Sequence, residues 1–116
     1  MSWEPVYRLV KQIPRGRVTT YGDLARALKV PGGGRVVGYA MAGCPSGRGI
    51  PWHRVVGAGG RLIVREPYAS KQRRLLESEG VEIGIRTLDM RRFGWFPKKA
   101  KKKQSKPRGG KRRKVQ

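Results

Sequence analysis

The sequence predicts a mainly α-helical, winged-helix-like domain that contains a helix-turn-helix and a small β-hairpin. Three observations support this fold class. Apolar residues recur at helical spacing in several segments of the first 80 residues. A Pro-Gly-Gly break at residues 31–33 separates two short helical segments, as in a helix-turn-helix. A Gly-Ala-Gly-Gly run at residues 57–60 joins two short β-prone stretches, which indicates a hairpin.

The first two helices have recognisable boundaries. An amphipathic helix begins near Trp3 and ends before Pro14, because proline breaks a helix. A second helix follows Thr20, whose side chain is a good N-cap, and Asp23 lies in its first turn. The apolar residues expected on the buried faces of these two helices are Trp3, Val6, Tyr7, Val10, Ile13, Leu24, Ala25 and Leu28.

The second half of the chain is expected to hold the hairpin and a further helix. The hairpin pairs residues 54–56 with residues 61–64. Pro67 opens the helix, and Gly80 ends it as a C-cap. Four scattered apolar residues beyond this helix are expected to cover the core, namely Val81, Ile83, Ile85 and Leu88.

Positive charge dominates the sequence and is unevenly placed. The 28 basic and 7 acidic residues give a net charge of +21. Residues 98–116 hold 11 of the basic residues and no acidic one, so residues 1–97 retain a net charge of +10. We expect residues 1–97 to form one DNA-binding domain and residues 98–116 a disordered basic tail. Such a field favours polyanions, and nucleic acid is the commonest of them.

Cysteine and histidine are each represented once, by Cys44 and His53. The chain therefore forms no internal disulfide and offers no credible metal cluster, and we expect no cofactor. No apolar run approaches the roughly 18 residues of a membrane span, and the N-terminus lacks a signal pattern. The sequence predicts a soluble protein of the cytoplasm or nucleoid, or of the nucleus in a eukaryote, with no membrane partner.

One seven-residue segment carries most of the functional information. Residues 50–56 read Ile-Pro-Trp-His-Arg-Val-Val. They resemble the Pro-Cys-His-Arg-Val active-site signature of the O6-alkylguanine-DNA alkyltransferases, with Trp52 in place of the acceptor cysteine. That replacement marks the alkyltransferase-like proteins of this family, which bind the same lesions without repairing them.

The resemblance covers residues 7–83 and includes the helix-turn-helix. Residues 16–25 look like the entry into the family's helix-turn-helix, and Arg35 begins a stretch that looks like the start of its recognition helix. Arg35 lies 14 residues after Tyr21, and Trp52 lies 17 residues after Arg35. Both spacings agree with the family.

The resemblance also assigns the residues of a former active site. In the family, a histidine and a glutamate activate the cysteine thiolate that attacks the alkyl carbon. These two positions correspond to His53 and Glu79. Trp52 supplies no nucleophile, because an indole nitrogen only donates, so we expect no enzyme activity. Cys44 stands where the family usually has an asparagine that braces the active-site turn, behind the pocket.

The implied DNA contacts lie on the helix-turn-helix. Tyr21 would push the 3′ phosphate of the target nucleotide, and Arg35 would fill the vacated stack and pair with the orphaned base. The alternatives are a core ring for Tyr21 and a solvated or phosphate-bound Arg35. The further DNA contacts expected are Thr20, Gly34 and Gly38.

Residues 35–43 are interpreted as the recognition helix, although adjacent valines also suit a strand. Its small residues would let the backbone approach a minor groove only about 6 Å wide. The small residues concerned are Gly34, Gly38, Ala40 and Ala42. For Ala40 and Ala42, tight helix packing explains the small side chain equally well.

The implied lesion pocket is formed by Trp52, Val55, Arg65 and Tyr68. Trp52 would give the extruded base an apolar wall, and the alternative is a simple core residue. The backbone carbonyls of Trp52 and Val55 would receive the guanine amino group. Arg65 matches an arginine that faces the lesion in alkyltransferase-like proteins. For Tyr68 the alternative is a core tyrosine at a helix start.

The resemblance therefore implies a protein, which we expect to be a monomer, that binds double-stranded DNA containing O6-alkylguanine and flags the damage for nucleotide excision repair proteins. Three alternatives stay open: an active alkyltransferase that uses another thiol, a helix-turn-helix transcription regulator, and a general packaging or ribosomal protein. The tail would add phosphate contacts, and a nuclear address at residues 111–114 is its alternative.

Overall fold

The structure of the protein is a computed structural model that describes residues 3–45 and 47–97. The basic tail predicted at residues 98–116 lies outside the described residues. In the described part of the chain, no helix is both long enough and apolar enough to cross a membrane.

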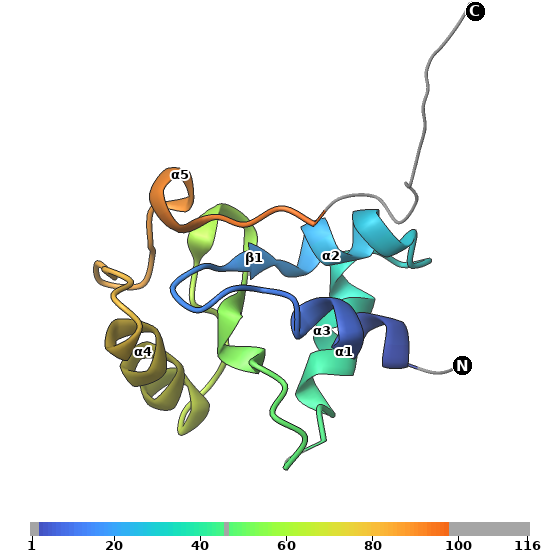
Figure 1. Cartoon of the computed structure of the whole chain (residues 1–116), viewed down its shortest axis with the longest axis horizontal. Helices are drawn as coiled ribbons and strands as arrows, with labels where there is room; N and C mark the ends of the chain where they lie inside the picture. The colour runs from blue at the N-terminus through green and yellow to red at the C-terminus, as the bar shows by residue number, and fades with distance from the viewer. Residues whose placement is uncertain (1–2, 46, 98–116) are drawn as a thin grey trace, which may run out of the picture.

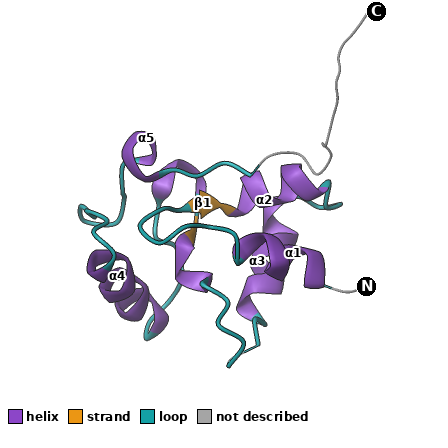
Figure 2. Cartoon of the chain, viewed as in Figure 1, coloured by secondary structure: helices purple, strands orange, loops and turns teal. Residues whose placement is uncertain are grey.

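Helices dominate the fold, and a small two-stranded sheet lies between them (Figures 1 and 2), so the mainly helical prediction is confirmed. The elements in chain order are α1 (Glu4–Val10), β1 (Thr19–Thr20), α2 (Tyr21–Leu28), α3 (Gly34–Ala42), the 3₁₀ turn η1 (Trp52–Arg54), β2 (Val55–Val56), the 3₁₀ turn η2 (Ala58–Gly60), α4 (Tyr68–Ser78) and α5 (Met90–Phe93).

The core consists of two apolar clusters on either side of the sheet. The first is enclosed by α1, α2 and α3, and the Tyr7 hydroxyl ties α1 to α3 by donating to the Ala40 carbonyl at 2.8 Å. The second lies beneath α4 and includes Leu76. Val55 belongs to the first cluster and Val56 to the second, because successive strand residues point to opposite faces.

The start of α2 matches the prediction. The Thr20 hydroxyl accepts a hydrogen bond from the Asp23 N–H at 3.0 Å and donates to the Asp23 carboxylate at 2.8 Å. This N-cap satisfies one of the unpaired N–H groups of the first turn. Because Thr20 is also the last residue of β1, the strand runs directly into the helix and fixes the place of Tyr21.

The hairpin differs from the prediction in its pairing. The two strands of the sheet are parallel, and they pair β2 with β1 rather than with residues 61–64. The expected antiparallel pairing is reduced to one bridge, between Gly57 and Arg61. The chain turns too tightly at η2 to continue a ladder, and Arg61 then forms an antiparallel bridge with Thr87 instead.

The residues after α4 cover the second cluster only in part. Val81 and Leu88 are buried as expected, and Ile83 packs against them from a partly buried position. The prediction is wrong for Ile85, which is 92% exposed. Ile85 lies in a turn that is closed by a hydrogen bond from the Gly84 N–H to the Thr87 carbonyl, and its side chain points away from the cluster.

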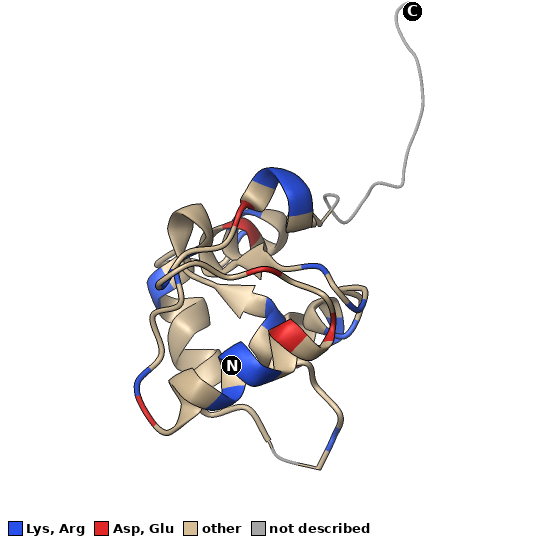
Figure 3. Ribbon diagram, turned by 90° about the vertical axis from the view of Figure 1, so that its left-hand side faces the viewer, with Lys and Arg blue, Asp and Glu red and all other residues tan. Residues whose placement is uncertain are grey.

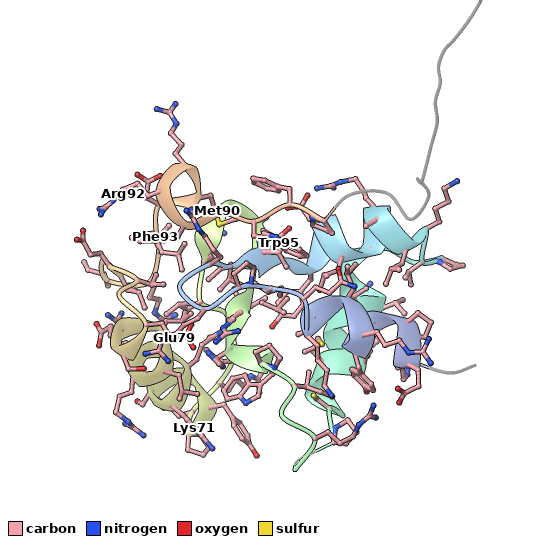
Figure 4. The ribbon with its side chains drawn as sticks, in the orientation of Figure 1. Lys71, Glu79, Met90, Arg92, Phe93 and Trp95 are labelled. Carbon is pink, nitrogen blue, oxygen red and sulfur yellow. The ribbon has the colours of Figure 1, made fainter. Side chains whose placement is uncertain are left out.

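The short helix α5 and the strand-like segment after it were not predicted. Asp89 caps α5 by accepting from the Arg91 N–H at 2.9 Å. The chain then lies beside β1, where the Val18 N–H donates to the Phe93 carbonyl and the Trp95 N–H donates to the Val18 carbonyl. Trp95 packs against the first cluster from this position, close to the start of α2 (Figure 4).

Candidate nucleic-acid interface

Helix α3 exposes one face and buries the other, as a recognition helix requires. Val37, Ala40 and Met41 are buried and fix the rotation of the helix. The opposite face carries Arg35 and Tyr39, both exposed. The prediction of a helix over residues 35–43 is confirmed to within one residue, and the alternative of a strand is wrong.

The small residues of α3 divide into two groups. A Cβ at Gly34 would lie 2.9 Å from the Gly22 nitrogen, so glycine is needed there for the close approach of α2 and α3. Ala40 is 1% exposed and packs in the core. A Cβ at Gly38 would meet nothing within 4 Å, and Ala42 is exposed, so packing explains neither of these two small residues.

The starts of α2 and α3 lie next to each other, which brings Tyr21 and Arg35 together. Tyr21 is the first residue of α2, and a Cβ on Gly34 would lie 3.2 Å from its carbonyl carbon. Burial raises the pKa of the Tyr21 phenol, and the ring packs partly against the first cluster. Thr20 is 7% exposed, and Asp23 occupies its hydroxyl, so Thr20 positions Tyr21 through the cap.

Trp52 lies in a small aromatic group at the start of η1. Its indole meets the His53 ring edge-on at 6.2 Å between centroids and the Tyr68 ring edge-on at 6.1 Å. Tyr68 is 60% exposed, which is more than a core tyrosine at a helix start would be. The structure thus brings two of the predicted pocket residues, Trp52 and Tyr68, into contact.

Arg65 and Val55 take up different places around this group. The Arg65 carbonyl accepts from the Tyr68 and Ala69 N–H groups, and its side chain is exposed. Val55 is buried, and its carbonyl accepts from the Gln72 side-chain amide at 3.0 Å. The Trp52 carbonyl accepts from the Val55 N–H. The Trp52 carbonyl keeps a second lone pair for the predicted contact with a guanine amino group, whereas Val55 is 0% exposed, so a base cannot reach its carbonyl in this structure.

His53 and Glu79 form the centre of a buried polar network that closes around the turn η1. The His53 Nε2 and a Glu79 carboxylate oxygen lie 2.8 Å apart. Arg54 donates to both carboxylate oxygens, at 3.0 and 2.8 Å, and to the Ile13 carbonyl at 2.8 Å. The Gly16 N–H also donates to Glu79, at 3.0 Å. Glu79, the residue after α4 (labelled in Figure 4), thus joins the end of this helix to η1 and to the chain before β1.

The protonation states of this network follow from its contacts. Burial lowers the pKa of His53 and outweighs the Glu79 carboxylate, which raises it, so the imidazole is neutral at pH 7. Burial alone would raise the pKa of Glu79. Hydrogen bonds from Arg54, Gly16 and His53 outweigh burial and lower this pKa from 4.5 to about 2. Glu79 is therefore ionised throughout the physiological range.

Arg54 and Gly16 are members of this network that sequence reasoning missed. Arg54 belongs to the quoted signature but received no role of its own, although an arginine beside a buried glutamate is the usual way to pair that charge. Gly16 contributes a backbone N–H, which no side-chain pattern reveals.

The structure does not bring Cys44 into the network. Its thiol is partly buried at the edge of the first cluster, and within the described residues its one hydrogen-bond contact is with the Pro45 carbonyl, at 4.0 Å. Burial raises the pKa of the thiol and outweighs the nearby Arg48 guanidinium, which lowers it. A thiol of this kind is a poor nucleophile at neutral pH.

The acidic residues of the chain are all engaged within it. Five lie in ion pairs with basic residues, namely Glu4, Asp23, Glu77, Glu79 and Glu82. Glu66 and Asp89 accept hydrogen bonds in the first turns of α4 and α5. The basic residues left over in the described chain are exposed, and they occur around the whole outline of the molecule (Figure 3).

Fold and interface together define a helix-turn-helix domain suited to binding nucleic acid. The family described as 6-O-methylguanine DNA methyltransferase, DNA binding domain, matches residues 2–81. The chain belongs to this family.

Two relatives are similar along almost their whole length. A DNA base-flipping protein of Vibrio parahaemolyticus is 34% identical over 93 residues, which cover 79% of this chain and 93% of the relative. Alkyltransferase-like protein 1 of Schizosaccharomyces pombe is 39% identical over 99 residues, which cover 79% of this chain and 92% of the relative.

Solved structures of proteins from the same family match the fold of this chain. Atl1 of S. pombe, in complex with damaged DNA containing O6-carboxymethylguanine, matches with a TM-score of 0.74 and 36% identity, over 82% of this chain and 94% of that one. The Mycobacterium tuberculosis protein OGT in complex with DNA matches with a TM-score of 0.60 and 36% identity, over 66% of this chain and 47% of that one. The winged-helix-like DNA-binding fold is thus the fold of proteins in this family.

Proposed function

We propose that this protein binds double-stranded DNA containing O6-alkylguanine, turns the altered base out of the stack, and holds it without removing the alkyl group. The observation that carries the proposal is the place of Trp52. Its indole lies against His53, which is hydrogen-bonded to Glu79, at the position where the family signature has its reactive cysteine. The base-flipping and alkyltransferase-like relatives support the proposal.

Tyr21 and Arg35 carry out the extrusion of the base. The raised pKa of Tyr21 keeps its hydroxyl protonated, so the phenol can donate to a phosphate while the cap at Thr20 holds it in place. Arg35 lies on the neighbouring helix start with its side chain exposed, from where its planar guanidinium can fill the vacated stack. Gly34 lets the two helix starts approach closely enough for both to act on one nucleotide.

The aromatic group of Trp52 and Tyr68 forms the wall of the lesion pocket. Alkyl groups added to O6 would pack against these rings, and each buried CH₂ contributes about 0.8 kcal/mol. Arg65 is exposed beside them and supplies a positive charge near the altered O6 edge. The second lone pair of the Trp52 carbonyl accepts the guanine amino group, whereas Val55 is 0% exposed and its carbonyl lies out of reach of the base.

No transfer follows, because nothing in this site can accept an alkyl group. An indole is no nucleophile toward alkyl carbon, and His53 has no thiol beside it to activate. Cys44 lies at the edge of the core with a raised pKa. The His53–Arg54–Glu79 network then acts as a brace that holds η1, and with it Trp52, in one position.

A protein that binds the lesion and leaves it intact can mark the damaged site for other proteins. We propose that it acts as a monomer and that its complex with bent DNA is received by nucleotide excision repair proteins. A flipped base and a bent duplex change the shape of the DNA, and DNA shape can be recognised without contact with the alkyl group itself.

A competition titration tests the central proposal. A fluorescent duplex of about 20 base pairs with one O6-methylguanine is displaced by unlabelled lesion duplex or by the matched unmodified duplex, at a stated salt concentration. We expect the lesion duplex to compete at least about tenfold better, a difference of about 1.4 kcal/mol. Equal competition would indicate a general DNA-binding protein, and preference for one unmodified sequence would indicate a transcription regulator.

Mass spectrometry of the recovered protein tests the absence of transfer. After incubation with an excess of lesion duplex, we expect the mass of the intact chain to be unchanged. A gain of one methyl group, mapped to Cys44, would establish an active alkyltransferase instead.

A further inference from the structure

The exposed face of α3 carries a large aromatic side chain besides Arg35. Tyr39 is 64% exposed. Within the part of the chain that the structure describes, its hydroxyl has no hydrogen-bond partner and its ring has no aromatic or cationic neighbour. An aromatic ring left in water on an ordered helix is a candidate contact, because it buries a large area at a small cost in conformational freedom.

The rotation of α3 places Tyr39 on the same face as Arg35. With Val37, Ala40 and Met41 turned to the core, the residues at positions 35, 38, 39 and 42 line the outer face at helical spacing. Gly38 lies beside these two long side chains on the same face, and a Cβ there would meet nothing within 4 Å. The helix surface next to Arg35 and Tyr39 therefore has an open notch at Gly38.

The charge of this face suits a polyanion. Helix α3 contains no acidic residue, and every acidic residue of the chain is already engaged in an ion pair or a helix cap. A phosphate strand along the outer face of α3 therefore meets positive charge from Arg35 and no opposing carboxylate on the helix.

We propose that Tyr39 is a further DNA-contact residue, the second on α3 after Arg35, whose ring packs against deoxyribose and base edges in the minor groove while its hydroxyl donates to the sugar-phosphate backbone. Four residues of helix correspond to about 6 Å along its axis, close to the rise of two base pairs. Tyr39 thus contacts the duplex beside the site that Arg35 fills and away from the extruded base. Apolar side chains in the minor groove hold a duplex in a bent form, so Tyr39 stabilises the bent DNA.

The inference rests on the proposed function, since it assumes that α3 docks in the minor groove. It makes a separate claim about binding outside the lesion. Because Tyr39 contacts the duplex outside the lesion, its contribution is the same for damaged and undamaged DNA. Trp52 and Tyr68, in contrast, are proposed to contact only the extruded base.

Binding of the full chain to lesion duplex and to matched unmodified duplex, measured by fluorescence anisotropy at one salt concentration, tests this claim. We expect Tyr39→Ala to weaken binding to both duplexes about tenfold and to leave the ratio of the two affinities within about twofold of the native ratio, as for the removal of a stacked aromatic side chain. Tyr39→Phe should weaken binding by no more than about threefold, because it keeps the ring. Ile85→Ala is the matched control, since Ile85 is 92% exposed on the turn between α4 and α5 and should change neither affinity.

Three outcomes would overturn the inference. The first is that Tyr39→Ala binds both duplexes as tightly as Ile85→Ala does, and the second is that Tyr39→Ala weakens binding to the lesion duplex alone. The third is that Tyr39→Phe weakens binding as much as Tyr39→Ala does. Circular dichroism melting checks that each variant is folded, and Tyr39→Gln, which keeps a good helix former, replaces the alanine variant if that one is not. If the native protein binds both duplexes equally, the proposed function fails, and the inference stands only if Tyr39→Ala still weakens both.

Discussion

At the scale of single residues, we propose that an indole stands where the family has a sulfur nucleophile, an exchange that would change what the rest of the site can do. His53 and Glu79 are hydrogen-bonded at 2.8 Å, and under this proposal the thiol that they would activate is absent. The Arg54 contacts make the same glutamate a structural anchor. We infer that the site holds an aromatic wall in place of a reactive thiol.

Replacement of Trp52 by alanine should remove the preference for the lesion. The variant lacks the ring that contacts His53 and Tyr68, so the extruded base has no wall while Arg35 and the phosphate contacts remain. We expect affinity for lesion duplex to fall about tenfold or more and affinity for unmodified duplex to change less than about threefold. Trp3→Ala is a suitable control, because Trp3 is also a partly buried indole against the first cluster. If Trp52→Ala keeps its preference for lesion duplex, the assignment of Trp52 to the lesion pocket is wrong.

The ionised Glu79 should make the fold sensitive to acid. Its pKa is about 2 in the folded protein and near 4.5 when unfolded, so it contributes stability above pH 4.5 that diminishes as the pH falls toward 2. The lowered pKa of His53 acts in the same direction, beginning at its unfolded value of 6.5. The contribution of Glu79 amounts to at most about 3 kcal/mol.

Urea unfolding of native protein and of Glu79→Gln, at pH 7 and at pH 3, measures this contribution. We expect the amide variant to be less stable by about 2–3 kcal/mol at pH 7, because Arg54 and His53 no longer have a charged partner. The difference should shrink at pH 3 to about two fifths of its value at pH 7, because the unfolded carboxyl is then almost fully protonated while the folded one, with a pKa of about 2, is still mostly ionised. A difference that is the same at both pH values would show that the charge of Glu79 contributes nothing to folding.

At the scale of elements, the close approach of α2 and α3 sets the relative position of Tyr21 and Arg35, which we propose as DNA-contact residues. Gly34→Ala should destabilise the fold by about 1–3 kcal/mol, since its Cβ would lie 2.9 Å from the Gly22 nitrogen and the backbone must shift. The same shift separates Tyr21 from Arg35, so DNA binding should weaken for lesion and unmodified duplex alike.

Gly38→Ala on the same helix provides the matched comparison. Its Cβ meets nothing within 4 Å, and alanine replaces a glycine inside a helix, so the fold should become more stable by about 0.5–1 kcal/mol. DNA binding should nevertheless weaken, because the methyl group fills the notch that faces the groove. Thermal unfolding and anisotropy together decide: if the variant is more stable and binds DNA as well as native protein, α3 does not approach the groove at Gly38.

Local signals predicted the elements that depend on local interactions. The Thr20 cap, the helix at residues 34–42 and the end of α4 at Gly80 follow from hydrogen bonds and backbone preferences within a few residues. The pairing of the sheet could not be predicted, because Val55 meets Thr19 from 36 residues away. The exposure of Ile85 and the roles of Arg54 and Gly34 likewise depend on which distant segment lies opposite. For the site, the motif indicated Trp52, His53 and Glu79, while the contact of Trp52 with Tyr68 required the fold.

At the scale of the whole molecule, we propose separate sources for affinity and for discrimination. The 28 basic residues far outnumber the seven acidic ones, so the net charge of +21 attracts DNA. Long-range attraction of this kind does not depend on a lesion, and it weakens with salt. We propose that discrimination belongs instead to the few residues around Trp52, which would act only after the base has been extruded.

Removal of residues 98–116 separates these two sources. The truncation takes away 11 basic residues and no acidic one, while the described chain ends beside β1 through the hydrogen bond between Trp95 and Val18 and should stay folded. We expect affinity for both duplexes to fall and the slope of log K against log salt to become shallower, by about 0.9 for each phosphate that the shortened chain no longer neutralises. The ratio of the affinity for lesion duplex to the affinity for unmodified duplex should stay the same.

Arg35→Ala, in contrast, should lower this ratio while it leaves most of the salt slope intact, because Arg35 is proposed to act on the vacated stack. If the truncation by itself abolishes the lesion preference, the discrimination belongs to the basic residues of 98–116 and the assignment of the pocket to Trp52 is wrong.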